Sequence, residues 1–355
     1  MKKILLLAMV FVMAFTGLAL AGQEWKVYGY SWARYTAEYA NPDFDDWASG
    51  FSIERTYIRL KNTDKSMGYE AAITLDINNE ADGQVVSNED ATDSDGDTYS
   101  KASGKVDWAI WMKYAYVDLT KLPGLKDIEA KLRIGLQKCY FGMIDLWEYP
   151  TIEKSFDDKN KILSSADQGI AIVGRIPGGW GTYEAGLYNG KGYKYEETNT
   201  EKRYIASLMV LPYPGVTVRG SYLREITSGL GDPAEGYSAW SIVLGLASGP
   251  VSLWSQYLKA KVDEAGTETS AKEGFSFTGQ VDLTEKASLL LRYDYLNPSI
   301  LTSAAIKSLY VFGVNYKIAD AVLLQLDAQQ AQEAGKEHET TIMAQVKFGW
   351  SKKLK

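Results

Sequence analysis

Apolar and polar residues alternate through most of the chain after its first twenty or so residues. In residues 128–137 every second residue is aliphatic or alanine, and the residues between them are charged, glycine or glutamine. Residues 69–77, 275–283, 287–295 and 340–350 follow a similar rule. Successive side chains of a β-strand point to opposite faces, whereas helical spacing would scatter these aliphatic residues around a helix. The pattern therefore predicts strands with one apolar and one polar face.

Sixteen such segments can be counted. They are residues 25–38, 51–61, 68–78, 105–119, 128–138, 168–176, 182–189, 202–210, 216–224, 237–246, 251–259, 274–283, 287–296, 307–316, 322–329 and 340–350. Segments of roughly ten residues in even number are typical of bacterial transmembrane barrels, and strands of soluble sheets are usually shorter. The sequence predicts an all-β fold, a transmembrane antiparallel β-barrel of about sixteen strands. A soluble β-sandwich or propeller is the alternative.

The connections between these segments alternate in length. One set is short and rich in Pro and Gly, which fix the backbone angles of tight turns, and the other set is longer and polar. Bacterial barrels place short turns on the periplasmic side and long loops outside. Both termini are therefore expected on the periplasmic side of a Gram-negative outer membrane.

The N-terminus has the features of an export signal. Lys2 and Lys3 precede the apolar residues 4–20, and Ala19 and Ala21 supply the small residues of a cleavage site. This arrangement predicts a cleaved signal peptide over residues 1–21, followed by a single barrel domain over residues 22–355; a membrane anchor is the alternative. No later segment has the roughly 18 apolar residues of a spanning helix. A closed barrel is the other structure that satisfies every backbone group in lipid.

Composition and charge narrow the partners. The chain has 24 Tyr, 10 Trp and 10 Phe, and amphipathic aromatic side chains collect at membrane–water interfaces. The net charge of −7 argues against a nucleic-acid partner, and a single cysteine, Cys139, excludes an internal disulfide. We expect outer-membrane lipid, lipopolysaccharide and small hydrophilic solutes or ions as partners.

The connection between the fifth and sixth predicted strands, residues 139–166, is long and rich in aromatic and apolar residues. A solvated loop has no need of them, whereas a loop folded back into the barrel must pack on its wall. We predict that residues 139–166 are an inward-folded constriction loop; a cap over the mouth or a contact with a neighbouring subunit are the alternatives. The charged residues assigned to the constriction are Asp145, Glu148, Glu153, Lys154, Asp157 and Asp158.

Basic residues recur on the polar faces of the predicted strands. The set assigned to the pore lining is Arg55, Arg59, Lys61, Lys131, Arg133, Arg175, Arg203, Arg219 and Arg292. Rings of arginine line anion pores, because the guanidinium meets oxyanions without losing its charge. The alternative is that these cations pair with Glu70, Asp76, Glu129, Glu184 and Asp294 and hold a polar lumen together. Anion preference is therefore a hypothesis at this point.

Metal and enzyme chemistry have little support in the sequence. Asp93, Asp95 and Asp97 surround a glycine as Ca²⁺ ligands can, but the spacing misses the full calcium-loop pattern, so a solvated acidic loop is favoured. The only histidine, His338, is flanked by two glutamates in a predicted loop, and no nucleophile accompanies it as a general base would require. We predict no metal site, no cofactor, no catalytic residue and no enzymatic activity.

Several short motifs suggest a family. Near the start, residues 55–59 read Arg-Thr-Tyr-Ile-Arg, and residues 132–138 lead into Phe141-Gly142. Further along, residues 167–170 read Asp-Gln-Gly-Ile, and residues 183–190 read Tyr-Glu-Ala-Gly-Leu-Tyr-Asn-Gly. This combination resembles the phosphate-selective porin O and P family over about a third of the chain. The family's Pro before Phe-Gly is missing, and residues 351–355 extend past the final aromatic residue.

The resemblance implies a sixteen-stranded, trimeric outer-membrane porin with a basic lumen; phosphate selectivity is not carried over. Our functional prediction is a water-filled channel for passive diffusion of small hydrophilic solutes or ions, with anion preference as a further hypothesis. The alternatives are a substrate-specific oxyanion or sugar channel, and a non-conducting structural or adhesion barrel scaffold.

Overall fold

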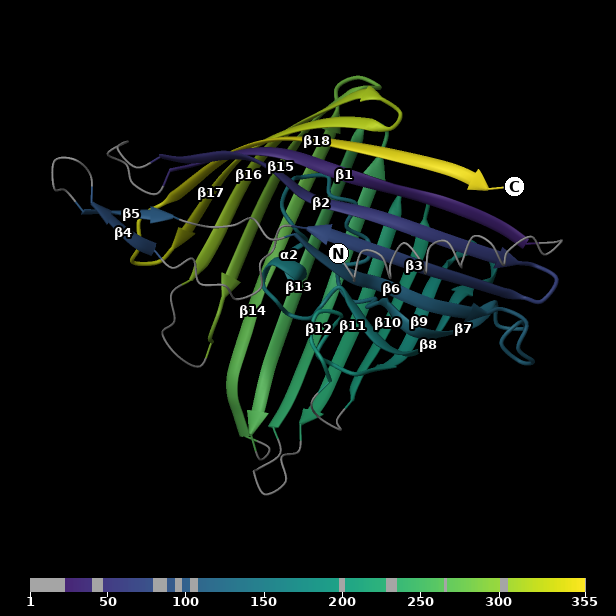
Figure 1. Cartoon of the computed structure of the whole chain (residues 1–355). Coiled ribbons are helices and arrows are strands. Elements are labelled where there is room, and N and C mark those ends of the chain that lie inside the picture. Colours follow the sequence, from purple (N-terminus) through teal and green to yellow (C-terminus); the bar gives the residue numbers. More distant parts are fainter. Residues whose placement is uncertain are drawn as a thin grey trace.

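Sixteen strands form one closed antiparallel barrel (Figure 1). The computed structural model describes residues 23–39, 47–78, 88–92, 98–102, 108–197, 202–227, 235–264, 267–300 and 306–354. Each barrel strand pairs with its neighbour along the chain, and β1 closes the barrel against β18. The predicted all-β barrel is confirmed. The predicted signal peptide, residues 1–21, lies outside the described residues.

The barrel strands correspond one to one with the sixteen predicted segments. They are β1 (Gln23–Tyr39), β2 (Trp47–Asp64), β3 (Tyr69–Asn78), β6 (Ala109–Leu119), β7 (Ala130–Lys138), β8 (Ala166–Ile176), β9 (Gly181–Tyr188), β10 (Arg203–Tyr213), β11 (Val216–Thr227), β12 (Glu235–Ser248), β13 (Val251–Glu264), β14 (Thr267–Asp282), β15 (Ala287–Asn297), β16 (Lys307–Ala319), β17 (Val322–Glu333) and β18 (Glu339–Leu354). A separate hairpin of β4 (Asn88–Thr92) and β5 (Thr98–Ala102) lies between β3 and β6. This hairpin was not among the predicted strands.

Several strands are longer than the alternation indicates. β14 begins at Thr267 instead of residue 274, so the connection from β13 is much shorter than the loop we expected. β18 continues past Trp350 to Leu354, where Leu354 pairs with Trp25 and Lys353 pairs with Lys26 of β1. The C-terminal residues 351–354 are therefore part of the seam that closes the barrel.

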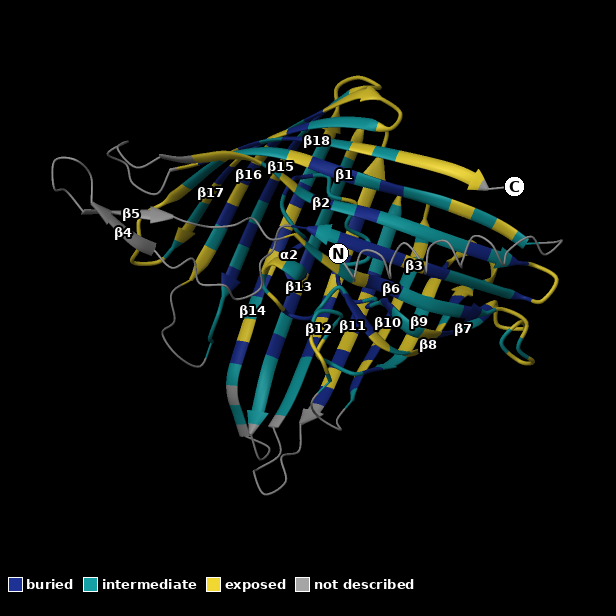
Figure 2. Cartoon of the chain, in the orientation of Figure 1, coloured by how far each residue is buried: buried dark blue, intermediate teal, exposed yellow. Residues whose placement is uncertain are grey.

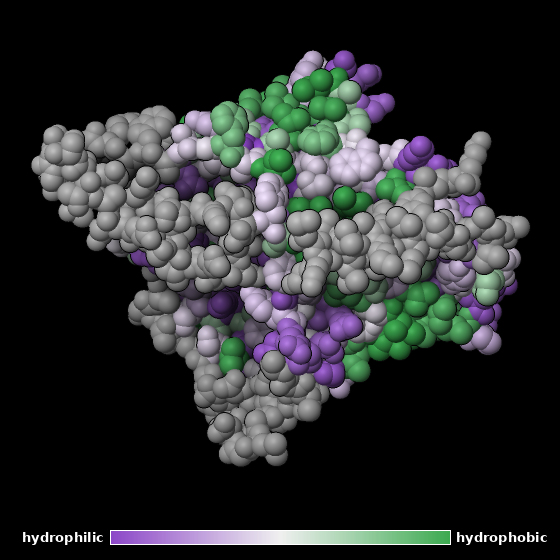
Figure 3. All heavy atoms as spheres, in the orientation of Figure 1, coloured by the Kyte–Doolittle hydropathy of each residue, from purple (hydrophilic) through white to green (hydrophobic). Residues whose placement is uncertain are grey.

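The two faces of the sheet have inverted polarity compared with a soluble protein. Exposed and buried residues alternate along most barrel strands (Figure 2), and large apolar side chains such as Leu208, Phe277 and Ile342 are exposed on the outside. Gln256 and Gln325, in contrast, are buried on the inside. Figure 3 shows apolar patches on the outer surface, one of them over β7 to β9. This is the distribution that a barrel surrounded by lipid requires.

Helical structure is minor. Among the residues that the structure describes, it comprises a short helix, α2 (Phe156–Lys159), and a 3₁₀ turn, η1 (Pro177–Gly179). In the described ranges, neither is long and apolar enough to cross a lipid bilayer.

Two β-bulges lie in neighbouring parts of the wall. The register between β1 and β2 shifts at Glu54, and the register between β3 and β6 shifts at Lys113. A bulge inserts one extra residue and turns consecutive side chains toward the same face. Met112 is half-exposed on the outside, whereas Lys113 and Tyr114 are both buried on the inside. This part of the wall therefore presents two adjacent large side chains to the lumen.

Candidate functional site

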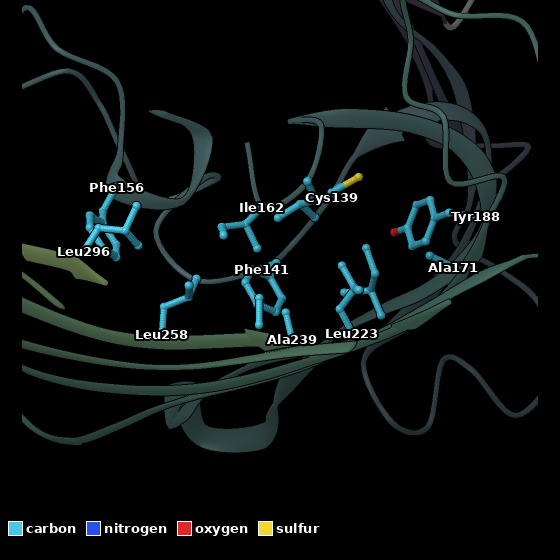
Figure 4. Close-up of a cluster of buried hydrophobic side chains, with 13 residues drawn as sticks. Cys139, Phe141, Phe156, Ile162, Ala171, Tyr188, Leu223, Ala239, Leu258 and Leu296 are labelled. Carbon is cyan, nitrogen blue, oxygen red and sulfur yellow. The ribbon is translucent and has the colours of Figure 1, made fainter. Parts of the chain in front are cut away.

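The connection between β7 and β8, residues 139–165, lies against the inner wall of the barrel; we call it the β7–β8 loop. Phe141 is fully buried and packs in one cluster with Leu223 of β11, Ala239 of β12 and Leu258 of β13 (Figure 4). Full burial of a side chain of this size stabilises a structure by about 1.5–3 kcal/mol. Phe141 is thus a major apolar anchor of the loop.

A second apolar contact lies further along the loop. Phe156 packs beside Leu296 of β15 (Figure 4). A Cβ added to Gly274 of β14 would lie 2.8 Å from Cζ of Phe156 and 2.3 Å from the carbonyl oxygen of Tyr295. Glycine at position 274 therefore leaves the space that the Phe156 ring fills.

The tip of the loop is held by hydrogen bonds to β16 and β17. Gln325 Nε2 donates to the carbonyl oxygen of Tyr149 at 3.0 Å, and Asn315 Nδ2 donates to that of Pro150 at 2.9 Å. The backbone N–H of Ile152 donates to Asp327 Oδ2 at 2.7 Å. Buried wall amides and loop carbonyls thus satisfy one another, as buried polar groups must.

These tip contacts continue into a row of side chains across the barrel seam. Gln345 Nε2 of β18 donates to Gln325 Oε1 at 3.0 Å, and Arg34 Nη2 of β1 donates to Gln345 Oε1 at 2.8 Å. The row joins β1, β18 and β17 to the loop tip. Because each member is oriented by the next, the position of the tip depends on four separate segments of the chain.

Asp157 joins the two limbs of the loop to each other and to the wall. Its Oδ2 accepts from the backbone N–H of Met143 at 2.8 Å and from Gln256 Nε2 of β13 at 3.1 Å. Gly142, next to Met143, has φ +54°, and its N–H donates to Ser221 Oγ at 3.2 Å. Burial raises the pKa of the Asp157 carboxyl. Asp157 is fully buried, so this member of the predicted constriction set borders no open space.

The other predicted constriction residues have different surroundings. Asp145 Oδ1 accepts from Arg219 Nη1 at 2.6 Å. Glu153 is paired with Lys159; burial opposes its ionisation, but this neighbour holds its pKa below the ordinary value. Glu148 is exposed. Arg292 Nη1 donates to the backbone carbonyl of Lys154 at 2.6 Å. Asp158 lines the space described next.

A polar space of about 190 Å³ separates the β7–β8 loop from the wall formed by β1, β2, β3 and β6; we call it the cleft. It is lined by five tyrosines together with Arg59, Lys113, Lys138 and Asp158, among others. A water molecule occupies about 30 Å³ in the liquid, so the cleft can hold several waters or one small ion. The loop therefore occupies one side of the lumen and leaves this opening on the other.

A larger cavity of about 610 Å³ lies on the side of the short turns. Lys131, Arg175, Glu184 and Arg219 line it, and Asp145 lines both this cavity and the cleft. The two spaces therefore adjoin at the loop.

Seven of the nine predicted pore-lining cations are in ion pairs with carboxylates. The pairs, with their N–O distances, are Arg55–Asp76 (3.0 Å), Lys61–Glu70 (2.7 Å), Lys131–Asp118 (2.6 Å), Arg133–Asp118 (2.6 Å), Arg203–Glu225 (2.6 Å), Arg219–Asp145 (2.6 Å) and Arg292–Asp294 (2.7 Å). Three of the expected partners, Glu70, Asp76 and Asp294, take part. Glu184 instead accepts from the Tyr188 hydroxyl, and Asp118 and Glu225 are partners that the sequence did not indicate.

Arg59 and Arg175 are the exceptions among the nine. Arg175 is exposed to the larger cavity. Arg59 Nε donates to Thr74 Oγ1 at 2.6 Å, and its guanidinium lies 5.4 Å from the ring centre of Tyr28 and 5.1 Å from that of Tyr114. Within the described ranges, no carboxylate is in ion-pair contact with Arg59.

Lys113 is a cleft residue that the sequence analysis missed. Its Nζ donates to Ser165 Oγ at 2.7 Å and lies 5.9 Å from the ring centre of Tyr57 and 4.5 Å from that of Tyr193. The alternation around it, with exposed Met112 before it, was a sufficient signal to place it on the lumen face. The bulge that brings Tyr114 beside it has no such signal.

Other candidate chemistry finds no support in the residues that the structure describes. They contain no group of three metal-ligating side chains; Asp93, Asp95 and Asp97 lie outside the described residues. His338 is exposed between β17 and β18. Cys139 is fully buried, and burial raises the pKa of its thiol well above the usual value.

Comparison with known proteins identifies the fold. No protein-family model matches the chain, and a search of curated proteins also finds no match. Among solved structures, the anion-selective porin from Comamonas acidovorans has a TM-score of 0.65 at 10% identity, covering 92% of this chain and 100% of that one. OmpT, an outer membrane protein of Vibrio cholerae, has a TM-score of 0.64 at 11% identity, covering 94% and 99%. The outer membrane channel DcaP of Acinetobacter baumannii has a TM-score of 0.63 at 9% identity, covering 94% and 99%. The chain therefore has a β-barrel fold similar to those of outer-membrane porins and channels.

Proposed function

We propose that this protein is an outer-membrane porin that lets small hydrophilic solutes or ions diffuse through a water-filled pore. The observation that carries the proposal is the β7–β8 loop, which is fixed along the inner wall of a closed barrel and leaves a polar cleft beside it. A channel of this design selects by size and by the electric field of its lining, without chemistry on the solute. The similar solved structures, which are porins and channels, support this reading.

The β7–β8 loop is the proposed constriction. Apolar anchors at Phe141 and Phe156 and hydrogen bonds at the tip hold it on the wall from β11 to β17. Because these anchors lie on the wall from β11 to β17, we expect solute to pass between the loop and the wall of β1, β2, β3 and β6. The cleft, about 190 Å³, then sets the size limit.

A modest anion preference is part of the proposal. Arg59, Lys113 and Lys138 line the cleft, whereas Asp145 is neutralised by Arg219 and leaves Asp158 as the opposing charge. Seven other wall cations are in ion pairs with six carboxylates, since Lys131 and Arg133 share Asp118, so together they contribute a net charge of only +1. We therefore expect a weaker preference than a wall of free arginines would give.

The orientation and assembly follow the same proposal. Both termini and the short turns lie at one end, since β1 begins beside the end of β18, and we assign that end to the periplasm. The outer face would contact lipid and, at the opposite end, lipopolysaccharide. A homotrimer is proposed; one similar structure, at 11% identity and a TM-score of 0.62, is described as the trimer form of OmpT.

The resemblance to the phosphate-selective porin O and P family stays a prediction. Its motifs have structural tasks here: Phe141-Gly142 anchors the loop, and Asp167 accepts from the backbone N–H of Gly190 at 2.7 Å. Both tasks concern the base of the loop and not the recognition of a solute. Phosphate selectivity is therefore not part of the proposed function.

Single-channel recording of the purified full-length protein in a planar bilayer tests the proposal. We expect stable conductance steps, an anion-selective reversal potential across a salt gradient, and larger steps when residues 140–164 are replaced by a short Gly-Ser linker. Unchanged steps in the deletion variant would refute the constriction. Folded protein that gives no steps would refute the channel and favour the scaffold alternative, and saturable flux of one sugar or oxyanion would favour the substrate-specific channel.

A further inference from the structure

We infer that the free positive charge of the cleft is carried by cations held on aromatic rings, and that these residues set the ion selectivity of the pore. They are Arg59, Lys113 and Lys347, which we call the ring-held cations. The inference rests on the proposed function as a channel. It assigns selectivity to residues other than the seven ion-paired cations on the wall.

Three of the rings that hold these cations, those of Tyr30, Trp32 and Tyr57, pack against one another inside the barrel. The ring centre of Tyr30 lies 5.3 Å from that of Trp32 and 5.1 Å from that of Tyr57. Trp32 also lies 4.8 Å from Tyr149 at the tip of the β7–β8 loop. Trp32 and Tyr57 are buried, so these rings belong to the lumen and not to the membrane interface.

Each ring-held cation contacts two rings. Arg59 lies over Tyr28 and Tyr114, and Lys113 lies over Tyr57 and Tyr193. Lys347 Nζ of β18 lies 5.1 Å from the ring centre of Tyr30 and 5.9 Å from that of Trp32. In the described part of the chain, none of the three cations is in ion-pair contact with a carboxylate. This distinguishes them from Arg55, Arg133 and Arg292, which also lie over rings but each pair with an aspartate.

The two ways of holding a cation differ in what a passing ion experiences. A carboxylate partner cancels the charge, so the pair presents only a dipole whose field falls off steeply. An aromatic face attracts the cation through its quadrupole and carries no net charge. A ring-held cation is therefore fixed in position while its full positive charge still acts on ions in the cleft.

The wall geometry places these charges at the narrow part of the lumen. Arg59 and Lys113 line the cleft directly, and Lys347 lies over Tyr30, which also lines it. The bulge in β6 turns both Lys113 and Tyr114 inward. The Tyr114 ring holds Arg59, so Lys113 and Arg59 are brought to the same part of the wall. Asp158 and Glu148 of the loop oppose these charges, and Lys138 adds one more.

Reversal potentials of charge-removing variants test the inference. A unit charge about 4 Å from a permeant ion changes its local concentration by about fivefold even with the dielectric constant of water. Because such a charge attracts anions and repels cations by the same factor, we expect Arg59→Gln and Lys113→Gln each to lower the anion-to-cation permeability ratio by more than about fivefold, up to about 25-fold, at ~0.1 M salt. The shift should nearly vanish at ~1 M salt, where charges are screened over about 3 Å. Arg59→Lys keeps the charge and should retain the wild-type ratio.

A matched control removes a carboxylate-held cation without changing the net charge. In the double variant Arg203→Gln, Glu225→Gln we expect the wild-type ratio, because this pair contributes no net charge. The inference is refuted if the wild type conducts and both single variants have the wild-type permeability ratio. It is also refuted if the double variant shifts the permeability ratio as much as the single variants do. The sign of the wild-type reversal potential tests the proposed anion preference separately, since the inference concerns only the difference between variant and wild type.

Discussion

The substitution Gly142→Ala tests how the β7–β8 loop is held. Gly142 has φ +54°, and an added Cβ would lie 2.1 Å from Asp157 Oδ2 and 2.5 Å from Gln256 Nε2. These are the two groups whose hydrogen bond joins the loop to β13. An alanine here must therefore displace the Asp157 carboxylate, which also accepts from the Met143 N–H.

The expected cost has two parts. A non-glycine residue in the left-handed region costs about 1–2 kcal/mol, and a buried Met143 N–H left without an acceptor costs a further ~1–3 kcal/mol. Gly249 provides a matched control, since its φ is +55° and an added Cβ would meet nothing within 4 Å. Gly249→Ala has the same strain without the collision, so the difference between the two variants isolates the contribution of the loop contact.

Conductance recording and limited proteolysis of the folded barrel measure the effect. We expect Gly142→Ala to give noisier and larger steps and faster cleavage within residues 139–165, while the barrel itself stays folded. Gly249→Ala should match the wild type in both assays. A Gly142→Ala protein that behaves like Gly249→Ala would show that the Asp157 contact does not hold the loop in place.

Three further predictions concern anchoring, pH and stability. Phe141→Ala should weaken loop anchoring by about 3–5 kcal/mol and raise conductance noise, whereas Phe277→Ala, the same change on the lipid-facing surface, should leave the noise unaltered. The raised pKa of Asp157 means that the folded loop binds more protons than the free loop. Anchoring of the loop should therefore weaken, and conductance noise should rise, as pH rises from about 4 through that raised pKa. In the variant Asp157→Asn the noise should no longer depend on pH. Arg203→Ala leaves Glu225 buried without its partner and should lower the free energy of unfolding by about 3 kcal/mol. The melting temperature should fall while the conductance stays unchanged, and an unchanged melting temperature would contradict the prediction.

The strand number could be predicted because one constraint acts on every strand. Each crossing must offer apolar side chains to lipid at every second position, and residues 128–137 follow that rule without exception on the outer face. Strand ends could not be predicted as well, because beyond the membrane the outer side chains need not be apolar. The extension of β14 back to Thr267 and of β18 on to Leu354 depends on pairing with a neighbour, which alternation does not reveal.

The chemistry of the lumen was only partly predictable. Alternation placed the nine basic residues on the polar face, but it could not say which carboxylate each would meet. Arg203 lies directly opposite Glu225 in the β10–β11 register, a pairing that becomes visible only when strand ends are known. Arg219 meets Asp145 only because the loop folds onto β11. Tyr57 alternates in phase with Arg55 and Arg59, so its place in the lumen could have been recognised even though tyrosine was expected at the membrane interface.

The barrel wall has two parts with different tasks, and this division follows from where buried polar groups find partners. From β11 to β17 the inward amides and charges, such as Gln256, Asn315 and Gln325, bond to the loop backbone or to Asp157. Without the loop these groups would lose those partners. On β1, β2, β6 and β18, by contrast, rings hold cations whose charge remains free. Substitutions on the first part should therefore act on conductance through the position of the loop. Substitutions of the ring-held cations should act on selectivity at constant conductance.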